Sequence, residues 1–81
     1  MIEVFITNVK TKRLAKKVLK FLESQFPLLN INFDLEDFNK PYPCGHSILR
    51  VEGDLIDIDS ILNQLEKQQI KSELLTDDIC V

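Results

Sequence analysis

One short segment of this 81-residue chain, Cys44-Gly45-His46, brings together two side chains that bind metals or take part in catalysis. A thiolate and an imidazole separated by one glycine can converge on a soft or borderline ion such as Cu(I) or Zn(II). Two ligands do not make a tight site, so a third would have to come from the neighbouring turn, from Asp37 or from a second copy of the chain. The segment therefore predicts Cys44 and His46 as metal ligands, and the simpler alternative is a surface hairpin with an incidental thiol.

The same pair lacks the surroundings that nucleophilic catalysis requires. A cysteine nucleophile needs an imidazole within hydrogen-bond reach, a third group that orients the imidazole, and an oxyanion hole. No acid–base pair or cofactor loop is visible elsewhere, and the two glycines, Gly45 and Gly53, are too far apart for a phosphate-binding loop. We therefore predict that the protein is not an enzyme and holds no cofactor other than the candidate Cu or Zn.

Charge narrows the range of partners. The net charge is −3, from thirteen acidic and ten basic residues, which argues against nucleic-acid binding because phosphate contacts depend on clustered Lys and Arg. The bases are nevertheless concentrated in and before the first predicted helix, at Lys10, Lys12, Arg13, Lys16, Lys17 and Lys20. Such segregation can steer an anionic partner toward that helix, although an ordinary solvated face is the more common explanation.

The predicted location is cytoplasmic. No apolar run approaches the ~20 residues that a membrane-spanning helix needs, and Met1 leads directly into a strand pattern. Two cysteines in such a chain usually stay reduced, and the predicted fold places Cys44 and Cys80 toward opposite ends. We therefore expect no membrane association and no Cys44–Cys80 disulfide.

Apolar spacing predicts six elements in the order strand, helix, strand, strand, helix, strand. The first helix is expected near 11–26, capped by Thr11 and stopped by Pro27, and the second is expected to begin after its cap, Asp57. The strands are expected near 2–7, 30–36, 48–52 and from residue 71 to 75 or as far as 81. This order predicts a single α+β domain over 1–81, a ferredoxin-like βαββαβ two-layer sandwich with strand order 4-1-3-2 and both helices on one face.

The open face of that sheet is the predicted interaction surface. We expect Ile2, Val4 and Ile6 to point toward the helices, which leaves Phe5 on the open face with Ile48 and Arg50. An apolar centre with a charged rim is typical of a modest protein-binding surface, although Phe38 and Tyr42 of the hairpin could cover part of it. Replacing Phe5 with Asp should then weaken self-association at little cost to folding.

The order and lengths of the elements resemble the heavy-metal-associated domains of copper chaperones and metal-transport ATPases. That family binds Cu(I) through a Met-x-Cys-x-x-Cys loop, whose positions fall within Thr7 to Lys12 here, where no thiol occurs. The segments Asn32 to Asp37 and Ile48 to Gly53 are also similar to small bacterial proteins of that fold without an assigned activity. The combined prediction is a small interaction module that acts through a protein partner or a homodimer, with metal handling by Cys44 and His46 as the alternative.

Overall fold

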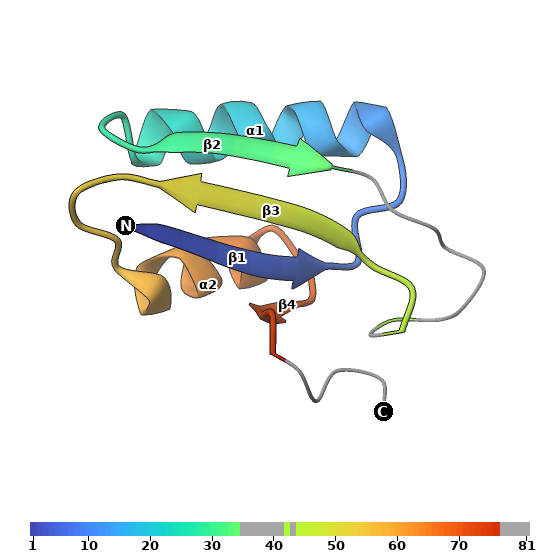
Figure 1. The fold of residues 1–81 in the computed structure, drawn as a ribbon. Helices are drawn as coiled ribbons and strands as arrows, with labels where there is room; N and C mark the ends of the chain where they lie inside the picture. The colour runs from blue at the N-terminus through green and yellow to red at the C-terminus, as the bar shows by residue number, and fades with distance from the viewer. Residues whose placement is uncertain (35–41, 43, 77–81) are drawn as a thin grey trace.

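The computed structural model describes residues 1–34, 42 and 44–76, and these contain all six predicted elements (Figure 1). In chain order they are β1 (Ile2–Thr7), α1 (Lys12–Gln25), β2 (Asn30–Asp34), β3 (Ser47–Glu52), α2 (Ile58–Lys67) and β4 (Ser72–Leu74). The predicted extension of the last strand toward residue 81 falls on residues outside those described.

The four strands form one antiparallel sheet in the order β2-β3-β1-β4, which is the predicted order 4-1-3-2 counted from the other edge. Both helices lie behind this sheet in Figure 1, so the molecule has two layers. The α+β ferredoxin-like fold is therefore confirmed.

Both predicted helix caps are present. The Thr11 hydroxyl accepts a hydrogen bond from the Leu14 amide at 3.1 Å, and the Asp57 carboxylate accepts one from the Ser60 amide at 3.1 Å. Each bond satisfies an amide that has no partner within the first helical turn. α1 ends at Gln25, two residues before Pro27, because the proline ring cannot continue the hydrogen-bond ladder.

The core lies between the helices and one face of the sheet. β3 contributes Leu49 and Val51, both fully buried, while its exposed Arg50 and Glu52 point the other way, as predicted. Full burial of a side chain of this size stabilises the fold by about 1.5–3 kcal/mol. The helices complete the core with buried residues from their apolar faces, namely Ala15, Val18, Leu22, Ile61 and Leu65.

The predicted orientation of β1 is wrong. Phe5 pairs with Leu49 across the two central strands and is fully buried among the core residues. Paired residues of an antiparallel sheet share a face, so Leu49 fixes Phe5 on the helix side and Val4 on the open side. Phe5 therefore does not belong to an exposed surface with Ile48 and Arg50, and Phe5→Asp would place a charge in the core.

Candidate functional site

The hairpin segment with the predicted metal ligands lies at the predicted end of the sheet. Ser47, directly after His46, pairs with Thr7 at the end of β1, so Cys44 and His46 share one end of the sheet with the β1–α1 turn. Two buried hydroxyls, those of Thr7 and Ser47, hydrogen-bond to each other at this point. The first strand and the hairpin are thus tied together beside the candidate ligands.

The structure changes the chemistry available at Cys44. Its sulfur is disulfide-bonded, so the prediction of a reduced thiol at this position is wrong. The other cysteine of the sequence, Cys80, lies outside the described residues, as does the candidate third ligand Asp37. A disulfide sulfur is not the thiolate that soft metals require. Metal binding by Cys44 and His46 therefore stays a prediction for the reduced protein.

A ready-made metal cluster is not found in the described part of the chain. Within residues 1–34, 42 and 44–76, no three His, Cys, Asp or Glu side chains are grouped so that they could hold an ion. The β1–α1 turn likewise supplies Thr7, Lys10 and Lys12 but no thiolate. The described side chains thus offer Cys44 and His46 no group of further ligands.

The open face of the sheet keeps two of the three residues predicted for it. Ile48 is half-buried and Arg50 is exposed, and Val4 takes the place that Phe5 was expected to have.

Tyr42 reaches the edge of the sheet, where its hydroxyl donates to the Glu73 carboxylate at 3.2 Å. Burial and the nearby Glu73 charge raise the pKa of Tyr42 to about 12, so its hydroxyl keeps its proton.

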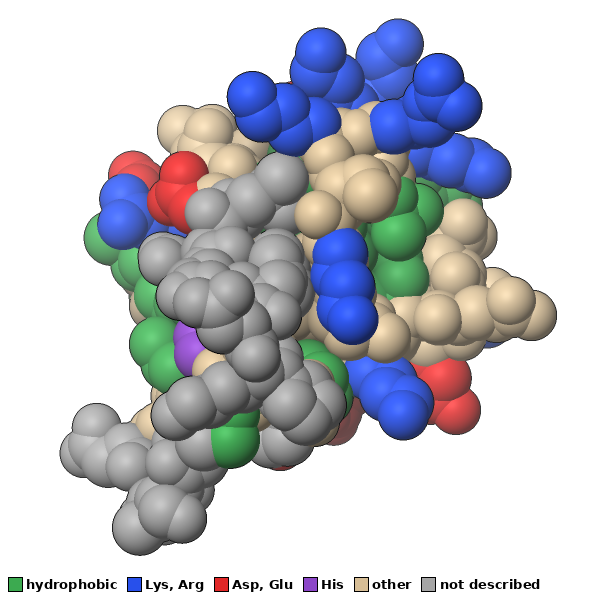
Figure 2. Space-filling view, turned by 90° about the vertical axis from the view of Figure 1, so that its right-hand side faces the viewer, with side chains coloured by type: hydrophobic (Ala, Val, Ile, Leu, Met, Phe, Trp, Pro, Cys, Tyr) green, Lys and Arg blue, Asp and Glu red, His purple; other side chains and the backbone are tan. Residues whose placement is uncertain are grey.

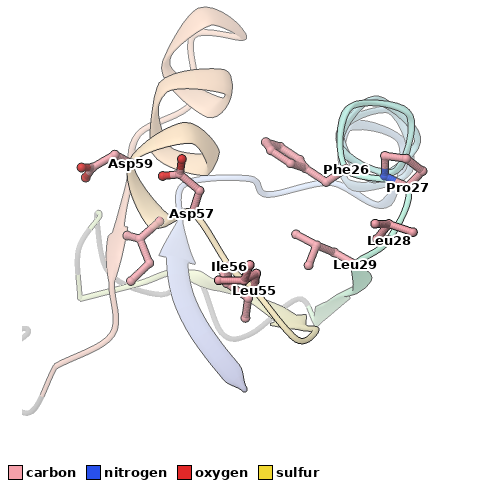
Figure 3. A pocket seen from close by; sticks show the side chains of 9 residues that line it. Phe26, Pro27, Leu28, Leu29, Leu55, Ile56, Asp57 and Asp59 are labelled. Atoms are coloured by element: carbon pink, nitrogen blue, oxygen red, sulfur yellow. The ribbon is translucent and has the colours of Figure 1, made fainter.

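An apolar hollow lies at the other end of the molecule. A cleft of about 870 Å³ opens between the turn that joins α1 to β2 and the loop that joins β3 to α2 (Figure 3). This apolar cleft is lined by Phe26, Pro27, Leu28, Leu29, Leu55, Ile56, Asp57, Ile58 and Asp59. Gly53 lets the two segments approach, because a Cβ there would meet the Leu29 side chain.

Two leucines on the cleft are almost completely exposed. Leu28, from the α1–β2 turn, is 93% exposed, and Leu55, from the β3–α2 loop, is 86% exposed. The amine and the carbonyl of Met1 both hydrogen-bond to the backbone of Gly53, at the start of the β3–α2 loop. The side chains of Met1 and Ile2 are 65% and 58% exposed. Four large apolar side chains thus meet water at one end of a small protein, and two of them, Leu28 and Leu55, border the same cleft. Exposed apolar patches of this kind mark binding sites.

The rim of the apolar cleft is acidic. Asp57 and Asp59 line it, and Asp54 is exposed on the same loop. The Ser60 amide lowers the pKa of Asp57 by hydrogen-bonding to its carboxylate, which therefore stays charged at neutral pH. No lysine or arginine is among the lining residues. The cleft consequently favours a ligand that is apolar at its centre and positively charged at its margin.

The sequence-based predictions do not include this cleft, although a signal for it is present. Pro27 and Gly53 end the elements before them, and the segments that follow them connect one element to the next. Yet Pro27-Leu28-Leu29 and Leu55-Ile56 place large apolar residues where a turn usually carries polar ones. An apolar pair in a turn signals either a buried loop or an exposed patch, and two such turns at the same end of a predicted sheet favour a patch.

Comparison with known proteins adds no identity. The chain matches no family model, no curated protein and no solved structure. Beyond the fold itself, a relation to heavy-metal-associated domains thus stays a prediction. In the described residues, neither helix is long and apolar enough to cross a bilayer.

Proposed function

We propose that this protein is a non-enzymatic protein-binding module that holds an apolar side chain of a partner in the apolar cleft. The observation that carries the proposal is the pair of leucines, Leu28 and Leu55, exposed to 93% and 86% where they border the cleft. Burying an aliphatic side chain of this size is worth about 1.5–3 kcal/mol. A partner that covered both would therefore gain a large part of the free energy that a modest interface needs.

The lining residues indicate how such a partner would be built. Apolar anchors that fill a pocket, inside a polar rim, dominate the binding energy of most protein interfaces. Here the cleft offers the pocket, its rim carries Asp57 and Asp59, and Asp54 is exposed on the same loop. The complementary segment of the partner has a large apolar residue flanked by lysine or arginine. Positive charges on the partner favour its encounter with this negatively charged rim.

A selection from random peptides tests the proposal. Peptides displayed on phage are selected on the immobilised protein, after removal of those that bind a Leu28→Ser/Leu55→Ser variant. Both positions are exposed, so the variant should fold as the wild type does, and circular dichroism checks this. A Leu75→Ser variant, altered at a leucine that is 46% exposed away from the cleft, is the control.

The expected result is a set of peptides with an aromatic or aliphatic anchor next to Lys or Arg. Synthetic versions should bind the double variant at least about tenfold more weakly than the wild type, because two apolar contacts are lost. The Leu75→Ser control should bind them unchanged. Selected peptides that bind the double variant as tightly as the wild type would show that the cleft is not the binding site.

Self-association through the open face of the sheet is a second candidate. It is favoured by three aliphatic residues that reach the surface of this face, namely Ile2, exposed to 58%, and the half-buried Val4 and Ile48, beside the fully buried Ile6 of the same face. Ile48→Asp should then lower the mass measured by analytical ultracentrifugation, whereas Asn63→Asp, which adds the same charge at an exposed position of α2, should not. A wild type that sediments as a monomer at high concentration excludes this candidate.

A further inference from the structure

We propose that the exposed face of α1 is a separate docking surface for an acidic polypeptide segment. The basic face consists of five side chains that are all exposed, Lys12, Arg13, Lys16, Lys17 and Lys20. Figure 2 shows Lys and Arg side chains gathered at the top of the molecule, where α1 lies. The proposal uses none of the residues of the apolar cleft, which begins at Phe26 after the last residue of this helix.

The five cations form one continuous surface because of their helical spacing. Lys12, Lys16 and Lys20 follow one another every four residues and make one ridge, and Arg13 and Lys17 make the next. The buried residues Ala15, Val18 and Leu22 lie on the opposite side and hold the helix against the sheet. The cations are thus presented outward on a helix that is fixed in place.

Acidic residues on the same helix do not balance these cations. The single acidic residue of α1 is Glu23, in its last turn, and the helix has no acidic residue in its first turn. Instead, Lys12 and Lys16, Arg13 and Lys17, and Lys16 and Lys20 stand four residues apart, where like charges repel each other. An anionic partner would relieve this repulsion, so the basic face is predisposed to bind one.

The spacing of the cations fits an extended peptide. One ridge repeats every four residues, or about 6 Å along the helix axis. In an extended chain, side chains on one side repeat every second residue, or about 6.6 Å. Alternate Asp or Glu residues of a partner can therefore meet Lys12, Lys16 and Lys20 in turn.

The same surface is a poor fit for two other polyanions. Single-stranded nucleic acid gains affinity by stacking bases on aromatic side chains, and the exposed residues of α1 include none. An anionic membrane is bound most firmly by helices that also insert an apolar face, whereas the apolar face of α1 is buried in the core. A short acidic polypeptide needs neither feature.

The experiment measures binding of three labelled probes by fluorescence anisotropy or vesicle sedimentation. The first is a synthetic peptide of alternating Glu and Ser, the second an oligothymidylate, and the third a set of vesicles that contain phosphatidylserine. The test variant is Lys16→Gln/Lys20→Gln, and the control is Arg50→Gln/Lys67→Gln, which removes the same charge from other elements. All four positions are exposed, and glutamine keeps a helix propensity close to that of lysine at the three that lie in helices, so both variants should stay folded.

We expect the glutamate peptide to bind best and to lose affinity as salt rises from about 50 to 300 mM, because exposed charges are screened. Lys16→Gln/Lys20→Gln should weaken this binding by about fivefold to tenfold, and the control by less than about twofold. Equal binding by the two variants would overturn the proposal. So would tighter binding of the oligonucleotide or the vesicles than of the peptide. These outcomes are independent of the apolar cleft, because the glutamate peptide carries no apolar anchor.

Discussion

The two helices occupy the same layer, yet their charges are arranged in opposite ways. Each begins at a side chain that caps its first turn, and each buries one apolar face against the sheet. α2 has Asp59 in its first turn and Lys67 in its last, which is the favourable placement along a helix dipole. α1 begins with Lys12 and Arg13, has no acid in its first turn and has no base in its last.

This difference separates charges that stabilise a helix from charges that do not. A positive side chain near a helix amino terminus opposes the dipole at a cost of about 0.3–1 kcal/mol at low ionic strength. The charges of α2 therefore stabilise that helix, whereas Lys12 and Arg13 oppose the dipole of α1. The basic face of α1 is accordingly the more informative of the two surfaces about a partner.

The largest expected effect concerns the core that both helices share. Phe5 is fully buried in the cluster that holds residues of α1 and α2, so Phe5→Ala should lower the free energy of unfolding by about 3–5 kcal/mol. Urea denaturation measures this value. Val4→Ala, on the open face of the same strand, is the matched control and should cost clearly less. A smaller loss of unfolding free energy for Phe5→Ala than for Val4→Ala would contradict the placement of Phe5 in the core.

Removing the cap of α1 should lower the free energy of unfolding by a moderate amount. Thr11→Ala removes the acceptor for the Leu14 amide and should lower the free energy of unfolding by about 1 kcal/mol, independently of pH because threonine does not titrate. Thr76→Ala, outside both helices, is the control, and thermal unfolding compares the two. A Thr11→Ala variant as stable as the wild type would mean that α1 finds another acceptor for its first turn.

At the α2 cap the comparison depends on pH. The folded-state pKa of Asp57 is lowered from 3.8 by the Ser60 amide, so its charge stabilises the fold above 3.8 and that contribution is lost as pH falls through the lowered value. Asp57→Asn keeps a capping oxygen but removes the charge. The variant should be less stable than the wild type at neutral pH and equal to it at strongly acidic pH, as measured by thermal unfolding. A difference that persists unchanged in acid would contradict a role for the charge.

The sequence predicted the elements because their boundaries rest on local chemistry. Thr11, Pro27, Gly53 and Asp57 begin or end elements through their own hydrogen bonds or backbone limits, and each acts where expected. The facing of β1 does not depend on local chemistry. One side of that strand carries Ile2, Val4 and Ile6, whereas the other carries Phe5 between the polar residues Glu3 and Thr7. Alternation therefore favoured the wrong side, and the partner strand β3 decided the orientation through the pairing of Phe5 with Leu49.

The candidate sites differ in how far the sequence alone could predict them, because some are formed by one element and others by segments far apart in the chain. The basic face of α1 is visible in the sequence, because one helix contains all of it. The apolar cleft joins two turns, around Leu28 and Leu55, that only the fold brings to the same end of the molecule. The state of Cys44 is likewise set by a bond that spacing did not predict.

A charge reversal at the start of α1 tests the comparison of the helices most directly. Lys12→Glu/Arg13→Glu puts acids where the dipole favours them and replaces the repulsion between Lys12 and Lys16 with attraction. We expect the free energy of unfolding to rise by about 0.5–1.5 kcal/mol at low salt, and by less at high salt. Asp59→Lys in the first turn of α2 should have the opposite sign. The reversed α1 should also bind the glutamate peptide more weakly, so that a gain in stability accompanies a loss of binding. A variant that loses both would show that Lys12 and Arg13 make stabilising contacts within the fold, and the basic face would then have an explanation that needs no partner.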